Sequence, residues 1–97
     1  MARANATYGA WRESPAGLHK EFRFDGFAEA LAFVVEVGRR AEKANHHPDI
    51  DLRFNKVFLS LVTHDAGCVT GKDKLLAAEI DRIPASHVDA RSKSLFS

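Results

Sequence analysis

The N-terminal part of the chain contains two stretches in which apolar and polar residues alternate, the pattern of half-buried β-strands. Residues 11–14 predict a short strand and residues 18–24 a longer one. Pro15-Ala16-Gly17 between them is a turn signal, because proline fixes φ and glycine permits backbone conformations closed to other residues. The two strands predict a β-hairpin, with Lys20 as the one polar residue on its apolar face. That face is formed by Leu18, Phe22 and Phe24.

The period of the apolar residues then changes to that of an α-helix. Residues 27–45 predict an amphipathic helix, with charged side chains mostly opposite its apolar face. Asp25 is the predicted N-cap, since a carboxylate there accepts a hydrogen bond from the first turn. Pro48 disfavours the α conformation of the residue before it, so the helix must end near Asn45. The apolar face is formed by Phe27, Leu31, Val34, Gly38 and Ala41.

The rest of the chain predicts two further strands and a second helix. Asp49–Arg53 predicts a short edge strand, and Phe54–Thr63 predicts a longer strand with apolar residues on both faces. A sheet with two apolar faces covers one of them with helices, and the other is expected to lie in a subunit contact. Thr70 and Asp73 have the spacing of a capping box that starts the second helix, which Pro84 ends.

The order of these elements is a hairpin, a helix, more strands and another helix. It predicts an α+β domain with an antiparallel sheet and helices on one face. We expect a single domain over residues 1–97. Within it, residues 1–10 are expected to form a loose arm, residues 11–84 the core, and residues 85–97 a flexible tail.

Charge and composition exclude several classes of function. The formal net charge is +1, from 14 Lys and Arg against 13 Asp and Glu, so the chain has no bulk electrostatic attraction to nucleic acid or anionic membranes. Its apolar stretches are too short to span a bilayer, and its first residues lack the apolar run of a secretory signal. The single cysteine, Cys68, cannot form an internal disulfide, which favours the cytoplasm or another reducing compartment.

Three of the five histidines lie at predicted element ends, where side chains reach the rim of a sheet and functional sites tend to form. His46 and His47 end the long helix, and His64 ends the long strand, next to a turn at Asp65–Gly67. Imidazole titrates near neutral pH, so it can both donate and accept protons. Glu42 lies at i, i+4 from His46, so we expect the two side chains to face each other and the carboxylate to orient the imidazole.

Each of these residues also has a purely structural interpretation. Histidines near a helix C-terminus interact favourably with the helix dipole, and Glu42–His46 is equally a surface pair of little energetic consequence. Asp65 is a common turn residue, and Asp73 is equally a helix cap. Three histidines with a carboxylate can hold zinc, but adjacent histidines followed by proline lack the i, i+4 spacing of helical zinc ligands. No metal site is therefore predicted.

The spacing of these residues resembles the signature of the pterin-4a-carbinolamine dehydratase family. That signature is a carboxylate, three residues, His-His-Pro, five residues, an aromatic residue, nine residues, a histidine and then an aspartate; the same gaps occur here. The match runs from Glu42 through Phe54 to Asp73, and the likeness extends from Trp11 through Ile83. A pattern of several parts with matched gaps is much more specific than any single short motif.

The chain also departs from the family pattern. Only ten residues precede Trp11, so the N-terminal helix of the family is expected to be short or missing. Three substitutions depart from the family pattern, and we expect the first two to lower or retune activity: Phe54 in place of tyrosine or tryptophan, Asn45 in place of aspartate, and Cys68 in place of glycine.

The resemblance implies a four-stranded antiparallel sheet with two or three helices packed on one face, and self-association into a homodimer or homotetramer. It implies a cytoplasmic dehydratase that removes water from 4a-hydroxytetrahydropterin (4a-hydroxytetrahydrobiopterin) and gives quinonoid dihydropterin. This reaction recycles the tetrahydrobiopterin used by aromatic amino-acid hydroxylases, which are the implied functional partners. The pterin is the substrate and no further cofactor is implied. No direct contact with nucleic acid or membrane is expected.

The implied mechanism is acid–base catalysis by three histidines. Loss of hydroxide from a carbinolamine needs an acid at the leaving oxygen and a base for the ring-nitrogen proton. We expect His47 to be the acid, and His46 and His64 to accept the ring proton and orient the pterin, with the assignment among the three left open. Glu42 is expected to orient His46. Asp73 is expected either to contact the catalytic residues without touching the substrate or to contact the pterin itself. The expected substrate-binding residues are His46, His47, Pro48, Thr63, His64, Asp65 and Ala66.

A non-catalytic binding module is the alternative interpretation. Some family members act as dimerisation cofactors of a homeodomain transcription factor, through a helix surface rather than the histidines, and such a role would place the protein in the nucleus as well. A third interpretation is an accessory protein of molybdopterin metabolism. The intact histidines favour the enzyme.

Overall fold

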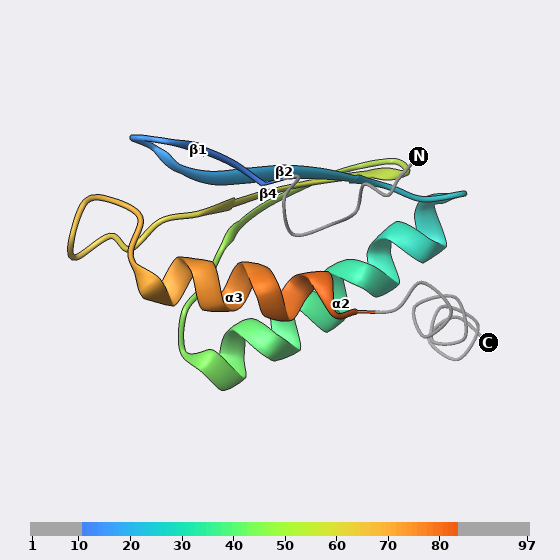
Figure 1. Ribbon diagram of the computed structural model, residues 1–97. Coiled ribbons are helices and arrows are strands. Elements are labelled where there is room, and N and C mark those ends of the chain that lie inside the picture. Colours follow the sequence, from blue (N-terminus) through green and yellow to red (C-terminus); the bar gives the residue numbers. More distant parts are fainter. Residues whose placement is uncertain (1–10, 84–97) are drawn as a thin grey trace.

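Four strands form one antiparallel sheet in the order β1-β2-β4-β3 (Figure 1). The computed structural model describes residues 11–83, and everything expected of residues 1–10 and 84–97 lies outside that range. The strands are β1 (Arg12–Ser14) and β2 (Gly17–Arg23), which form the predicted hairpin, the edge strand β3 (Asp49–Arg53), and β4 (Lys56–Leu61) between β2 and β3. This arrangement confirms an α+β fold with a four-stranded antiparallel sheet.

The helices α2 (Phe27–Ala44) and α3 (Gly71–Asp81) lie on the same face of the sheet (Figure 1). Neither is long and apolar enough to cross a membrane, and residues 11–83 contain no other candidate span. The core fills the space between these helices and the strands, and each fully buried large apolar side chain stabilises the fold by about 1.5–3 kcal/mol. The larger residues of this core are Leu18, Phe33, Val37, Val57, Leu59, Leu61, Leu76 and Ile80.

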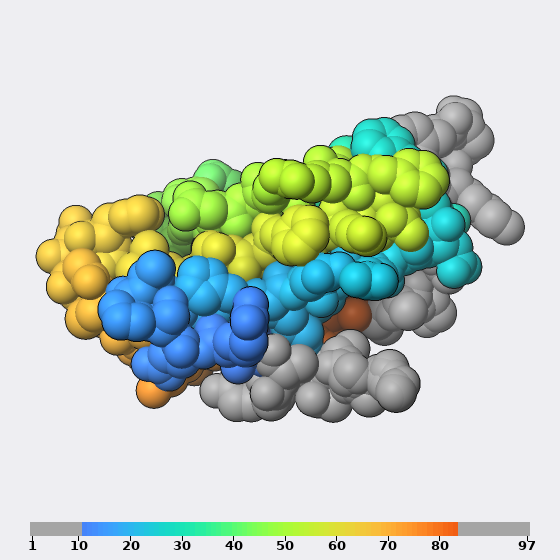
Figure 2. Space-filling view, turned by 90° about the horizontal axis from the view of Figure 1, so that it is seen from above, coloured from blue at the N-terminus to red at the C-terminus, as the bar shows by residue number. Residues whose placement is uncertain are grey.

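The opposite face of the sheet is open in the view from above the strands (Figure 2). β4 contributes one apolar residue to this face, Phe58, with 36% of its surface exposed. The guanidinium of Arg53 lies 6.0 Å from the Phe58 ring centroid. His19 lies between two hydroxyl groups, 2.9 Å from Ser14 Oγ and 3.0 Å from Ser60 Oγ. A subunit contact on this face stays a prediction.

Lys20, the polar residue on the apolar face of the hairpin, is buried in an ion pair. Its ammonium lies 2.7 Å from Asp81 Oδ1, and the two side chains are 3% and 9% exposed. Trp11 Nε1 donates to the other oxygen of Asp81 at 3.0 Å, and the Lys20 ammonium also lies 4.7 Å from the Phe22 ring centroid. Because a buried charge requires such partners, the pair ties the hairpin to the last residue of α3.

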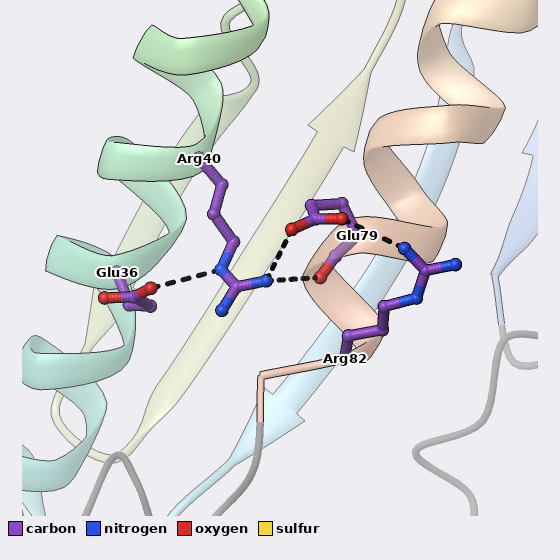
Figure 3. Close-up of polar contacts among 4 residues, drawn as sticks. All are labelled: Glu36, Arg40, Glu79 and Arg82. Carbon is purple, nitrogen blue, oxygen red and sulfur yellow. Dashed lines mark hydrogen bonds and ion pairs between the residues drawn. The ribbon is translucent and has the colours of Figure 1, made fainter.

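Arg40 joins α2 to α3 (Figure 3). Its Nε donates to Glu36 on the same helix at 3.1 Å, and its Nη1 donates to the Glu79 carboxylate at 2.6 Å and to the Glu79 carbonyl at 3.3 Å. Arg82 contacts the other Glu79 carboxylate oxygen at 3.1 Å, but its side chain is 73% exposed. Arg82 pairs with Glu79 within the end of α3, so Arg40, which is 22% exposed, is the residue of this group that joins the two helices.

The strand predicted over Phe54–Thr63 is shorter than expected at both ends. Phe54 has φ of 50° and is 68% exposed, because the chain turns there between β3 and β4. Asn55 connects this turn to the residue after β2, since its side-chain amide donates to the Phe24 carbonyl at 3.0 Å. At the other end, Thr63 pairs with Cys68 in an isolated bridge beyond the strand.

The two helix starts differ from each other. The predicted cap at Asp25 is wrong, since the N-cap of α2 is Gly26, which has an extended backbone and makes no side-chain cap bond. The capping box predicted for α3 is confirmed: Thr70 Oγ1 accepts from the N–H of Lys72 at 3.3 Å, and Asp73 accepts from the N–H of Thr70 at 2.9 Å. This cap holds Asp73 inside the protein.

Candidate active site

Asp73 lies at the centre of a buried hydrogen-bond cluster at the start of α3, with 0% of its side chain exposed. Its Oδ2 accepts hydrogen bonds from the Thr63 hydroxyl at 2.8 Å and from the Thr70 N–H at 2.9 Å. Its Oδ1 lies 2.6 Å from His46 Nε2. Both carboxylate oxygens therefore have partners, as a buried charge requires.

This cluster decides the ionisation of Asp73. Burial by itself would raise the pKa of Asp73, because it penalises the charged carboxylate. The hydrogen bonds from His46, Thr70 and Thr63 outweigh burial, so the pKa of Asp73 lies below its usual value. Asp73 is ionised at neutral pH and can only accept hydrogen bonds. His46 Nε2 must then carry a hydrogen, which leaves the lone pair of the neutral imidazole on Nδ1.

The end of α2 turns His46 toward Asp73. Asn45 is the C-cap, with φ of 52° and ψ of 43°, a left-handed conformation that asparagine tolerates better than most residues. The N–H of His46 donates to the Ala41 carbonyl at 3.1 Å and holds the turn. The predicted pairing of Glu42 with His46 is therefore wrong, because α2 ends before Asn45 and helical i, i+4 geometry no longer applies there.

Glu42 contacts His47 instead. Its Oε2 lies 2.5 Å from His47 Nε2, and the two side chains are 78% and 56% exposed. Water screens an ion pair at such a position, so it contributes little to stability. The His46 side chain, in contrast, is 13% exposed. The site thus contains one histidine–carboxylate pair that is mostly buried and one that faces solvent.

His64 lies in the exposed turn 64–67 at the end of the molecule where α3 begins (Figure 1). Thr63 closes this turn, because its carbonyl accepts a hydrogen bond from the N–H of Gly67 at 2.8 Å. Thr63 itself is 9% exposed, and its hydroxyl reaches Asp73. The chain therefore buries Thr63 and exposes the histidine that follows it.

Two threonine side chains support the Asp73 cluster, and the sequence revealed the role of only one of them. A backbone contact of Thr63 with substrate was predicted, but its N–H donates to the Cys68 carbonyl at 3.2 Å and its carbonyl is bonded within the turn. The Thr63 and Thr70 hydroxyl oxygens lie 2.6 Å apart. The capping-box spacing was a signal for Thr70, whereas no sequence pattern pointed to the Thr63 hydroxyl.

The other predicted site residues lie around the cluster rather than in it. Pro48 is half-buried directly before β3, and Asp65 and Ala66 are exposed in the turn. Among residues 11–83, the side chain of His64 has no hydrogen bond to the other predicted site residues, and no group of three or more His, Cys, Asp or Glu side chains is arranged to hold a metal ion.

The structure is a small α+β protein in which two histidines adjacent in sequence each contact a carboxylate. The family model described as pterin 4 alpha carbinolamine dehydratase matches residues 1–83, and the chain belongs to this family. It is 55% identical to a protein of Roseiflexus castenholzii, over 75% of this chain and 78% of that one. A protein of Chloroflexus aurantiacus is 56% identical over the same shares. Both are named, provisionally, as pterin-4-alpha-carbinolamine dehydratases.

Two solved structures share this fold. A transcriptional coactivator/pterin dehydratase from Brucella melitensis superposes with a TM-score of 0.70 and 28% identity, over 74% of this chain and 79% of that chain. A pterin dehydratase-like protein, identified as a RuBisCO assembly factor in the alpha-carboxysome, has a TM-score of 0.64 and 27% identity, over 74% of this chain and 86% of that chain. The fold therefore occurs in proteins described as dehydratases and in one described as an assembly factor.

Proposed function

We propose that this protein catalyses the dehydration of 4a-hydroxytetrahydropterin to quinonoid dihydropterin by histidine acid–base catalysis. The observation that carries the proposal is the pair of neighbouring imidazoles with different environments, one against a buried carboxylate and one in solvent. Family membership supports the dehydratase class. The recycling of tetrahydrobiopterin and the link to a hydroxylase are part of the same proposal.

His46 is suited to accept a proton. Asp73 accepts the hydrogen of His46 Nε2, so the lone pair of the neutral ring lies on Nδ1. When Nδ1 takes a proton from a ring nitrogen of the pterin, the buried carboxylate stabilises the imidazolium that forms. No movement of Asp73 is needed during this step, because its other oxygen is already held by Thr63 and Thr70.

His47 is suited to donate a proton. Its exposed position lets it exchange protons with water, and Glu42 accepts the Nε2 hydrogen of the imidazolium. The proton on Nδ1 is then available to the leaving hydroxyl. The C4a–O bond breaks as this proton arrives, water departs, and the ring nitrogen loses its proton to the base. One proton is delivered and one is removed, so the reaction needs no oxidant or reductant.

The flat pterin would lie against the exposed residues around this cluster. We propose that Pro48, His64 and the backbone of Asp65 and Ala66 contact it, since all are at least partly exposed. The peptide groups of Thr63 are already hydrogen-bonded within the protein. His64 would orient the pterin or share the ring proton.

The test is the rate of dehydration of freshly generated 4a-hydroxytetrahydropterin, followed by ultraviolet absorbance. We expect the natural chain to exceed the spontaneous rate and His47→Ala to lower kcat by about 10²–10⁴-fold, the range for loss of a general acid. His19→Gln is the matched control, because His19 lies between Ser14 and Ser60 on the open face of the sheet. Equal rates for His47→Ala and the natural chain would exclude the acid role of His47.

A non-catalytic assembly or coactivator role is the second candidate. It is favoured by the descriptions of the two structural relatives, one as an assembly factor and one partly as a coactivator. A folded natural chain that does not exceed the spontaneous rate would support this role and reject the enzyme. The turnover assay therefore separates the two functions.

A further inference from the structure

The hydrogen bonds around Thr63 have a definite direction. A hydroxyl has one hydrogen, and that of Thr63 is donated to Asp73 Oδ2 at 2.8 Å. The 2.6 Å contact between the two threonine hydroxyls must then use the hydrogen of Thr70, whose oxygen also accepts from the N–H of Lys72. The chain of donors thus runs from Thr70 through Thr63 to Asp73.

This chain of hydrogen bonds fixes the plane in which the Asp73 carboxylate faces His46. The Thr63 hydroxyl and the Thr70 N–H both donate to Oδ2, which holds the carboxylate plane and leaves Oδ1 directed at His46 Nε2. Without the Thr63 hydroxyl, Oδ2 loses one of its two donors, and the Thr70 hydroxyl loses its acceptor. A buried hydroxyl without an acceptor favours rearrangement of the cluster.

Thr63 also anchors the segment that carries His64. Its N–H donates to the Cys68 carbonyl at 3.2 Å, and its carbonyl accepts from the N–H groups of Ala66 at 3.0 Å and Gly67 at 2.8 Å. One residue therefore connects the turn of His64 with the Asp73 cluster, through its backbone on one side and its side chain on the other.

We infer that Thr63 is a positioning residue: its hydroxyl orients Asp73, which holds His46 in the tautomer with hydrogen on Nε2 and the lone pair on Nδ1. The inference rests on the proposed function for its consequence in catalysis, because only the dehydration reaction uses Nδ1 of His46 as a base. The tautomer itself is a property of the folded protein and does not depend on any activity.

The experiment compares Thr63→Val, which replaces the hydroxyl with a methyl group of similar size, with Thr63→Ser, which keeps the hydroxyl. The ring nitrogens of His46 are observed by ¹⁵N NMR, which distinguishes the two neutral tautomers. We expect hydrogen on Nε2 in the natural chain and in Thr63→Ser, and a mixture of tautomers in Thr63→Val. An unchanged tautomer in folded Thr63→Val would overturn the inference.

Turnover is the second measurement. We expect Thr63→Val to lower kcat by about tenfold, the factor for loss of one net hydrogen bond, with KM changed by less than about twofold. Thr63→Ser should restore most of kcat. A lower melting temperature with unchanged kcat and tautomer would show a structural role alone and overturn the inference. If Thr63→Val does not fold, Thr63→Cys replaces it, because a thiol is a weaker donor of similar size and should give an intermediate mixture.

The two proposals fail separately. A natural chain that does not accelerate dehydration rejects the proposed function, while the ¹⁵N measurement still confirms or overturns the role of Thr63 in the tautomer of His46. A natural chain that is active, with Thr63→Val equal to it in kcat and tautomer, rejects the role of Thr63 and leaves the proposed function in place.

Discussion

The substitution Asp73→Asn would test whether the buried carboxylate decides the tautomer of His46. In the natural chain Oδ2 accepts from Thr63 and from the Thr70 N–H, and Oδ1 faces His46 at 2.6 Å. An asparagine that keeps its oxygen at the Oδ2 position preserves the two threonine contacts. Its amide nitrogen then faces His46 Nε2 as a donor, so that atom must accept, and the hydrogen of the neutral ring moves to Nδ1.

The magnitudes follow from which contacts change. A hydrogen bond that involves a charged group contributes about 1.5–3 kcal/mol, and a neutral one about 1 kcal/mol. The exchange at His46 should therefore cost about 1–2 kcal/mol of unfolding free energy, since the cap of α3 survives. The effect on turnover should be larger, because Nδ1 no longer carries a lone pair. We expect kcat to fall by about 10²–10⁴-fold, the contribution of a general base.

The assay combines urea unfolding, the absorbance change of pterin dehydration, and ¹⁵N NMR of the His46 ring. Asp25→Asn is the matched control, because it makes the same change at an exposed position before α2, outside the candidate site. A kcat within about threefold of the natural chain, in a protein whose His46 tautomer has reversed, would refute the claim that Nδ1 is the base. An unreversed tautomer would refute the reasoning about Asp73 itself.

Three further predictions concern stability. Because the pKa of Asp73 is lowered in the folded protein from its ordinary value of 3.8, its contribution to the free energy of unfolding should be complete well above that value and be lost as pH falls through the lower folded pKa. Urea unfolding from pH 7 down to below the folded pKa should show the natural chain and Asp73→Asn converging in acid. Asp81→Ala should cost about 1.5–3 kcal/mol in thermal or urea unfolding, because it removes a charged acceptor from the buried Lys20 ammonium and from Trp11, and a loss below about 0.5 kcal/mol would contradict this. Arg40→Ala should lower the free energy of unfolding by about 1–2 kcal/mol, whereas Arg82→Ala, at a 73% exposed position, should lower it by less than about 0.5 kcal/mol. Equal losses for the two variants would contradict the argument that the less exposed arginine contributes more.

The strands and helices were predictable because their signals are local. Alternation in the hairpin, the helical period after residue 26 and the capping box at Thr70 each depend on residues within one element. Boundaries were less predictable: Phe54 has the apolar character of a strand residue, but its φ of 50° places it in the turn. Lys20 breaks the alternation of its strand, and its burial depends on Asp81, which is 61 positions away.

The histidine and carboxylate residues were predictable as a set, but their pairing was not. Glu42 and His46 have the spacing of helical neighbours, and only the left-handed conformation of Asn45 shows that this spacing does not apply. The true partner of His46 is Asp73, 27 positions later, which reaches it because α3 packs beside α2. The consequence is chemical, because a buried carboxylate can fix a tautomer while an exposed one is largely screened by water. The different environments of the two imidazoles, which support the proposed base and acid, therefore result from tertiary packing rather than from the motif.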